Sequence, residues 1–229
     1  MSIQIENKVP FSDSKLWGWQ RGYYSVKGIE AWSSNDVPFE VTSNPYIASS
    51  YANIIVRFIQ DYSRQNPETA KEPFYILELG AGTGQFSYYF LKALISLLSE
   101  LDMKQVNIRY VMSDISKKNI NFWKDNNAFN TFLRKDILYF AELDLESDFN
   151  EIILQESDFI FSKEHSLINP LTIIANYVFS ALHNDIFSVQ NNTLHESLIS
   201  LTSKENNIDN EYPKDLKKIH IEYEDKEID

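Results

Sequence analysis

The chain has 229 residues, 43% hydrophobic and 24% charged, which suits one large domain with a packed core. Its 21 basic and 33 acidic residues give a formal net charge of −12, which disfavours nucleic acid and anionic membranes as partners. The chain has no cysteine, which excludes a disulfide scaffold, a cysteine nucleophile and a thiolate zinc site. With no secretory signal and no run of about 18 apolar residues, we expect a soluble cytoplasmic protein.

The first 45 residues are aromatic and interrupted by glycine and proline. Trp17, Trp19 and Trp32 lie here, between Gly18, Gly22, Gly28 and Pro38. The interruptions predict an irregular segment, and the rings indicate that it folds over the rest of the chain. These rings can pack in a core or contact a ligand, and the sequence leaves both open.

Alternating helices and strands follow. Ser43 or Asn44 can cap a helix that Pro45 begins, and Ser116 can cap another that runs to about Trp123. Apolar residues at helical spacing predict helices over 46–62 and 86–101, and short apolar runs predict strands over 73–79, 106–112, 132–138 and 171–178. Residues 140–157 are acidic and ambiguous. The alternation indicates an α/β fold with a parallel sheet flanked by helices.

The C-terminal part has a different pattern. Strands over 186–190 and 194–201 are joined across Asn191-Asn192, which tolerates the positive φ of a tight hairpin turn. From Glu205 onward the chain is strongly charged and reads as a solvated extension or an unfinished strand. We therefore expect an N-terminal segment (1–45), a central domain (46–204) and an acidic extension (205–229).

The strongest local signal is a glycine-rich run between a buried strand and a long helix. It reads Glu78, Leu79, Gly80, Ala81, Gly82, Thr83, Gly84. At such a junction free backbone N–H groups point outward, and glycines let a ligand lie against bare main chain. A nucleotide-like ligand is therefore expected at the carboxyl end of the strand. A tight connection without a ligand is the alternative.

Two common nucleotide-binding patterns do not fit this run. The dinucleotide fingerprint needs a glycine where Gln85 stands, which disfavours an NAD-linked oxidoreductase, and no P-loop lysine follows Gly84. What remains resembles motif I of the class I S-adenosylmethionine (SAM) methyltransferases. The resemblance implies a Rossmann-like fold, SAM as cofactor, and contacts from Glu78 and from the run Gly80, Ala81, Gly82, Thr83 and Gly84.

The same resemblance implies two further cofactor contacts. In that family an acidic residue after the second strand accepts the ribose hydroxyls, and here Asp114 with Ile115 stands in that place. After the third strand an acidic or amide residue often meets the adenine, and Asp136-Ile137 fits that pattern. Asp114 can instead be an ordinary helix-entry residue, and Asp136 an ordinary surface turn residue.

A narrower resemblance covers roughly residues 15–200. The segments Gly22–Ser25 and Pro38–Pro45, the helix and motif I are similar to the front half of the MidA-like methyltransferases, and 173–183 resembles their Asn-Glu-x-x-Asp-Ala-Leu-Pro stretch. Members of that branch are linked to assembly of respiratory complex I, and one methylates an arginine. The resemblance implies a protein partner or protein substrate, and a chain that stops before the last strands of the family's sheet.

The acceptor half departs from that pattern. Tyr177 replaces the family's Glu, Ser180 its Asp and His183 its Pro, while Asn176 is kept. Arginine methylation needs carboxylates that orient the guanidinium, and this stretch lacks two of them. Asn176 is our candidate for binding the acceptor and His183 for a base. The chain's histidines show no metal-ligand spacing, so no metal is expected.

Two functions fit these residues. The first is a SAM-dependent methyltransferase whose N-terminal aromatic segment covers the cofactor and whose acceptor is unidentified. The second is a degenerate relative that keeps the fold, or the cofactor, and acts by binding another protein without turnover. The altered residues at Tyr177 and Ser180 motivate the second hypothesis. The oligomeric state is not indicated by the sequence.

Overall fold

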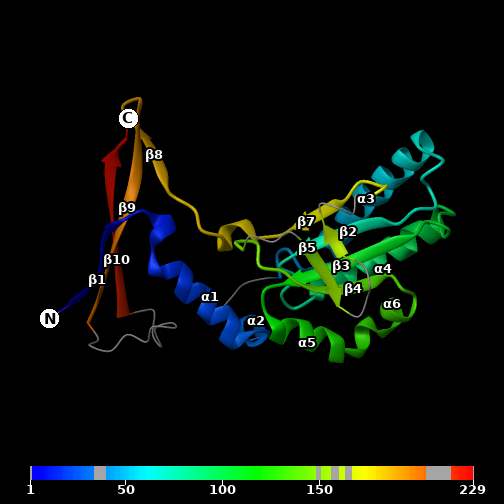
Figure 1. Cartoon of the computed structure of the whole chain (residues 1–229), viewed down its shortest axis with the longest axis horizontal. Coiled ribbons are helices and arrows are strands. Elements are labelled where there is room, and N and C mark those ends of the chain that lie inside the picture. The colour runs from blue at the N-terminus through cyan, green and yellow to red at the C-terminus, as the bar shows by residue number, and fades with distance from the viewer. Residues whose placement is uncertain are drawn as a thin grey trace. The chain divides into compact units, whose positions relative to one another are not determined.

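The structure is a computed structural model of the whole chain (Figure 1). It describes residues 2–33, 40–147, 151–155, 160–162, 167–204 and 218–228. The chain divides into two compact units, one formed by Met1–Val26 with Ser180–Asp229, and the other by Lys27–Phe179.

The unit Lys27–Phe179 contains a mixed sheet and its helices. Its elements are α2 (Glu30–Ser33), α3 (Pro45–Gln65), β2 (Phe74–Leu79), α4 (Gln85–Glu100), β3 (Ile108–Asp114), α5 (Lys117–Asp125), η2 (Asn127–Phe129), α6 (Asn130–Arg134), β4 (Leu138–Glu142), β5 (Glu151–Gln155), β6 (Ile160–Ser162) and β7 (Thr172–Ala175). The strand order is β6-β5-β4-β3-β2-β7. Strands β4, β3, β2 and β7 run parallel, and β5 and β6 add antiparallel pairs. The predicted α/β fold with a parallel sheet is confirmed.

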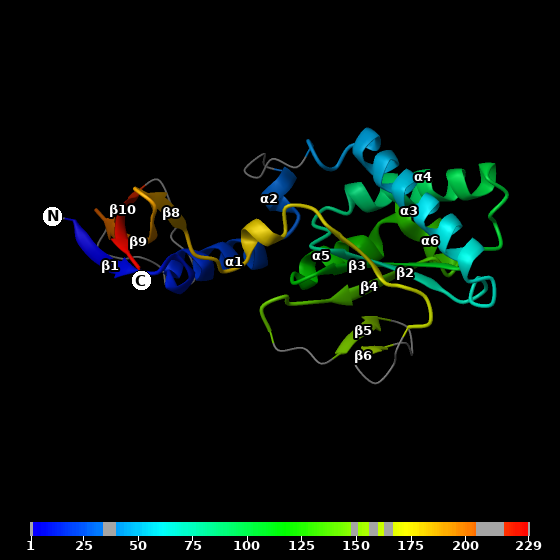
Figure 2. The same cartoon turned by 90° about the horizontal axis from the view of Figure 1, so that it is seen from above.

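The two faces of this sheet are covered differently (Figure 2). Helices α3, α4 and α5 cover one face, where Ile76, Phe90 and Tyr110 belong to one buried core. The opposite face packs against β5, β6 and the segments beside them. Phe161 of β6 lies 5.0 Å from Tyr75 of β2, ring centroid to ring centroid, although three strands separate β6 from β2 in the sheet. The sheet therefore curls back over its own second face.

Helix starts in this unit follow the predicted caps. The Asn44 side chain accepts a hydrogen bond from Ile47 N (3.0 Å), and Pro45 occupies the first turn of α3. The Ser116 side chain accepts from Asn119 N at the start of α5. Both predictions are confirmed, and Asn44 rather than Ser43 is the cap.

The other unit is built on an antiparallel sheet. Its elements are β1 (Ile3–Val9), η1 (Phe11–Asp13), α1 (Lys15–Lys27), η3 (Phe179–Ala181), β8 (Phe187–Gln190), β9 (Thr193–Ser203) and β10 (Ile219–Glu227). The last residue of α1 and the first residue of η3 belong to the other unit. Strand β9 pairs with β1, β8 and β10. Trp19, Ile199 and Leu201 form its buried core. The predicted hairpin is confirmed, with Asn191 and Asn192 at φ 51° and 66°.

Two predicted elements are wrong. Residues 1–45 are not an irregular segment, because they contain β1 and the 13-residue helix α1. The internal glycines Gly18 and Gly22 suggested breaks, but packing of Trp17 and Trp19, both 5% exposed, holds the helix. The strand expected over 132–138 does not form either, since α6 ends at Arg134 and β4 begins at Leu138.

The described part of the chain contains no helix long and apolar enough to cross a membrane. Part of the segment predicted as an extension forms β10, which pairs along β9 from Ile219 to Glu227. The strand alternative therefore holds for these residues, while residues 205–217 lie outside the described part.

Candidate functional site

The glycine-rich run is a tight turn between β2 and α4. Gly80, Gly82 and Gly84 have φ angles of 64°, 54° and 74°, a conformation that other residues rarely adopt. A Cβ atom on Gly82 would lie 3.1 Å from Cζ2 of Trp32, and one on Gly84 would lie 2.9 Å from Cε of Met112. Any other residue at these positions is therefore strained and must displace a neighbouring side chain. Trp32 shows that a ring from the N-terminal segment covers part of it.

Asp114 ties this turn to the end of β3. Its Oδ2 accepts from Gly82 N (3.0 Å) and its Oδ1 from Ser116 N (2.8 Å). Burial raises the pKa of this carboxyl, and hydrogen bonds from Ser116, Asn119, Gly82 and Ile115 act against that rise. A ribose hydroxyl that binds Asp114 would replace one of these donors. Ile115 is 41% exposed at the same strand end.

Further hydrogen bonds fix the turn. Ala81 N donates to Ser113 O (2.9 Å), and the indole N–H of Trp123 donates to Gly82 O (3.0 Å). The Thr83 hydroxyl accepts from Gln85 N (3.2 Å) at the start of α4. The main chain of the turn is therefore held by β3 and α5 before any ligand arrives, as preorganised binding requires.

Glu78 lies beneath the turn in a buried polar cluster. It is 4% exposed, and its Oε2 accepts from Ser87 Oγ (2.5 Å) and Tyr110 Oη (2.6 Å). Burial raises the pKa of Glu78 to about 7, although both hydrogen bonds oppose the rise. Burial and the neighbouring Glu78 carboxylate raise the pKa of Tyr110. Glu78 is thus poised to exchange a proton near neutral pH.

Asn176 lies at the same edge of the sheet. Strand β7 runs parallel to β2 with Ala175 opposite Leu79, so Asn176 and Gly80 leave the sheet side by side. The carboxamide Oδ1 of Asn176 accepts from Tyr51 Oη (2.8 Å). The structure thus brings Asn176, Asp114 and the glycine turn to the carboxyl ends of adjacent parallel strands, where ligands bind in such sheets.

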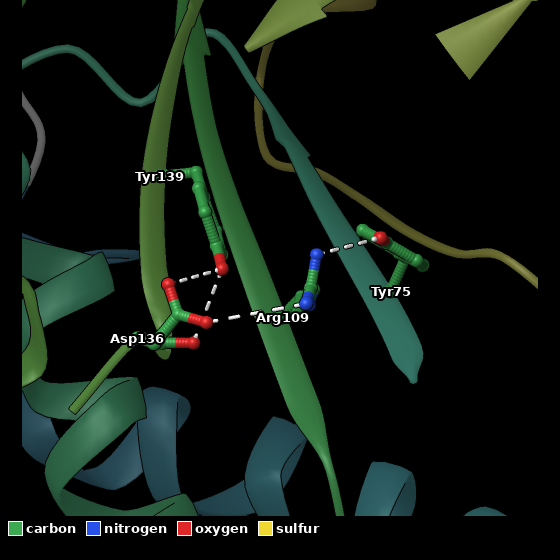
Figure 3. A network of polar contacts seen from close by, with 4 residues as sticks. All are labelled: Tyr75, Arg109, Asp136 and Tyr139. Carbon is green, nitrogen blue, oxygen red and sulfur yellow. Dashed lines mark hydrogen bonds and ion pairs between the residues drawn. The ribbon is translucent and has the colours of Figure 1, made fainter. Parts of the chain in front are cut away.

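Asp136 and Ile137 are not at this edge. They precede β4, with Asp136 at φ 57°, and so lie at the amino end of the parallel strands. Figure 3 shows Asp136 in a network with Tyr139, Arg109 and Tyr75. The Asp136 carboxylate accepts from Tyr139 Oη (2.6 Å) and is 3.9 Å from Arg109, which donates to Tyr75 Oη (3.2 Å). The prediction that Asp136 and Ile137 follow the third strand is wrong, because that strand is β4, which begins at Leu138 and not at Phe132.

Asp144 is the acidic residue that follows β4. The adjacent Leu143 N donates to Asp114 O (3.0 Å), which places this segment beside the end of β3. Asp144 Oδ1 accepts from Glu146 N (3.0 Å). The run Leu138–Glu142, rich in aromatic and apolar residues, was the sequence signal for this strand, and the acidic composition around it obscured that signal.

His183 belongs to the other unit. It lies 5.4 Å from Trp17, ring centroid to ring centroid, and both residues are part of the unit built on β9. Asn176 and His183 thus belong to different units.

Comparison with known proteins decides the family. A family model described as "Putative S-adenosyl-L-methionine-dependent methyltransferase" matches residues 52–227, which is more than half of the chain. The chain belongs to this family. The match confirms the predicted methyltransferase fold and SAM as the family's cofactor. Among curated proteins, none matches the chain.

Two solved structures from Burkholderia thailandensis are similar. One, solved with bound S-adenosyl-homocysteine, has 16% identity and a TM-score of 0.49, and the match covers 96% of this chain and 46% of that chain. The other is a native crystal structure of an uncharacterised protein, with 18% identity and a TM-score of 0.47, and the match covers 96% of this chain and 44% of that chain. The chain therefore spans less than half the length of these proteins.

The space beside Gly82 is filled by the Trp32 ring and that beside Gly84 by Met112 and Phe129, so the chain's own side chains lie against these two glycines. Two other groups at the carboxyl edge have chemistry that suits SAM. Nδ2 of Asn176 is buried without a hydrogen-bond partner in the part of the chain that the structure describes, so the edge also offers an unused donor. The carboxylate of Asp114 suits hydroxyl groups of a ribose.

Proposed function

We propose that the chain is a methyltransferase of the MidA-like branch that binds SAM at the carboxyl ends of β2 and β3. The observation that carries this proposal is the preformed glycine turn, tied to Asp114 through Gly82 N. SAM supplies an electrophilic methyl group whose carbon–sulfur bond breaks with the electron pair retained on sulfur. The protein's part is then to bind, to orient and to exclude water.

Each residue of the edge has a role in this proposal. The turn from Gly80 to Gly84 cradles the cofactor, and Asp114 offers its carboxylate to the ribose hydroxyls. Asp144, rather than Asp136, takes the place beside the adenine because it follows β4. The Trp32 ring covers the turn on the side where a Cβ of Gly82 would stand.

The acceptor approaches Asn176 in this proposal. A side chain of a partner protein is the acceptor class that the MidA-like resemblance favours. Arg109 and Asp136 bind each other at the amino end of the strands and take no part in transfer.

Calorimetry with S-adenosyl-homocysteine tests the cofactor site. Asp114→Asn should weaken binding at least tenfold, because a hydrogen bond to a charged group contributes about 1.5–3 kcal/mol. Asp136→Asn is the matched control and should bind within about twofold of wild type. Asp136 precedes β4 and lies at the amino end of the parallel strands, whereas Asp114 lies at their carboxyl end. Circular dichroism must show that both variants are folded. Wild type that does not bind S-adenosyl-homocysteine would contradict the proposal.

A binding module without turnover is the second candidate. Tyr177, 73% exposed, stands where the resembling family has a carboxylate, so the acceptor half lacks an orienting charge. Incubation with methyl-labelled SAM and a cell extract separates the two candidates. Labelling of a protein or small molecule that is lost in Asn176→Ala supports the enzyme, whereas cofactor binding with no labelled product supports the binding module.

A further inference from the structure

Asn176 is held from one side by a residue far away in the sequence. Tyr51 of α3 donates its hydroxyl to Oδ1 of Asn176 over 2.8 Å. The Tyr51 ring packs edge-on against Phe86 of α4, with 5.4 Å between the ring centroids. Because α3 and α4 both fix the tyrosine, its hydroxyl has little freedom, and the carboxamide plane of Asn176 is fixed with it.

The other end of the same carboxamide is unused. Nδ2 of Asn176 is buried, and it has no hydrogen-bond partner within the described residues. A buried donor without a partner costs about 1–3 kcal/mol. The next residue, Tyr177, has φ 57°, which is a further strain for a residue other than glycine. Such costs gather at functional sites, and here they lie beside Gly80.

We propose that Tyr51 is a positioning residue for Asn176, and that Nδ2 of Asn176 donates a hydrogen bond to an oxygen atom of the methyl acceptor. The inference rests on the proposed function and adds the class of acceptor. Tyr51 already donates to Oδ1, whereas the buried Nδ2 has no partner within the described residues, so the N–H groups are the part of the carboxamide left unpaired. An amide, a carboxylate or a hydroxyl satisfies such a donor, whereas a guanidinium carries donors only.

This assignment agrees with the side chains that follow. A guanidinium acceptor needs carboxylates around it, and Tyr177 stands where the resembling family has one of them. Next to Asn176 a carboxylate is therefore missing, while the amide donor is kept. An oxygen-bearing acceptor group is the chemistry that matches this combination.

The side-chain amide signal of Asn176 in a ¹⁵N-labelled protein tests the inference. Acetamide, acetate and methylguanidine are titrated as probes of the three acceptor chemistries, with and without S-adenosyl-homocysteine. We expect acetamide or acetate to shift the Asn176 Nδ2 signal and methylguanidine to leave it unchanged. Tyr51→Phe keeps the ring on Phe86 and should weaken the acetamide response about fivefold, as the loss of one hydrogen bond implies. Tyr62→Phe, on the same helix, should respond as wild type.

Two results would overturn the inference. A shift with methylguanidine and none with acetamide or acetate would show that the carboxamide presents its oxygen. An equal acetamide response in Tyr51→Phe and wild type would show that Tyr51 does not position Asn176. The titration without S-adenosyl-homocysteine tests Asn176 and Tyr51 whether or not the cofactor binds. Calorimetry tests cofactor binding separately, so a failure of this inference can be distinguished from a failure of the proposed function.

Discussion

Glu78 gives the most direct test of the electrostatics beneath the glycine turn. Its carboxyl is buried, and its pKa rises from 4.5 to about 7 on folding. Between these values the folded protein binds more protons than the unfolded chain, so the free energy of unfolding falls as pH rises through this window. The rise corresponds to roughly 3 kcal/mol, at about 1.4 kcal/mol per pKa unit. This stability is fully present below pH 4.5 and is lost as pH rises through about 7.

Glu78→Gln should remove this dependence. The amide oxygen can still accept from Ser87 and Tyr110, and the side chain no longer has to be ionised in a buried place. The variant should match wild type near pH 4.5 and exceed its stability at pH 8 by up to roughly 3 kcal/mol.

Urea unfolding at several pH values measures the pH dependence of the free energy of unfolding. Hydrogen exchange of β2 and β3 is used as the probe, because it reports on the unit that contains Glu78. Glu68→Gln, at an exposed position, is the matched control and should keep the wild-type slope. A Glu78→Gln variant with the same pH dependence as wild type would refute the reasoning.

Three further predictions concern the turns. Gly84→Ala should destabilise by about 2 kcal/mol in urea unfolding, because it combines φ 74° with a Cβ 2.9 Å from Met112 Cε; an unchanged midpoint would contradict this. Trp123→Phe should destabilise by about 1–3 kcal/mol, because it leaves the carbonyl of Gly82 without its indole donor, and the same assay checks it. Asn192→Gly should stabilise the β8–β9 hairpin by about 0.5 kcal/mol, since glycine adopts φ 66° without strain, and hydrogen exchange in β9 should slow.

Elements with strong periodicity could be predicted from the sequence. The apolar residues of α3 and α4 repeat at helical spacing over several turns, and the caps Asn44 and Ser116 mark where helices begin. The glycine turn was also predictable, since only a strand-to-helix junction that needs positive φ explains glycine at 80, 82 and 84.

Short or irregular patterns could not be resolved in this way. Phe132 and Leu133 form too short an apolar run to distinguish a strand from the helix α6 that they occupy. Trp17 and Trp19 are both buried, although two residues this close in sequence do not lie on one face of a helix. The glycine between them also argued against a helix. Their burial depends on contacts made by residues distant in the sequence, which a single sequence does not show.

Side-chain pairs across the fold were equally hidden. Tyr51 and Asn176 are separated by 125 positions, and Glu78 and Tyr110 by 32. Each of these residues is unremarkable where it stands: a tyrosine on a buried helical face, an amide after a strand. Their pairing depends on the register of β2 with β3 and β7, which no local pattern encodes.

The bounds of β4 place two aspartates at opposite ends of the strand. Asp136 and Asp144 flank this strand, and its five residues separate its two ends by roughly 16 Å at about 3.3 Å per residue. At the amino end Arg109 lies between the rings of Tyr75 and Tyr139 and forms an ion pair with Asp136. At the carboxyl end Asp144 follows Leu143, which bonds to the strand that carries Asp114. The same residue type therefore closes a structural network at the amino end and follows the strand at the carboxyl end, where our proposal places the adenine.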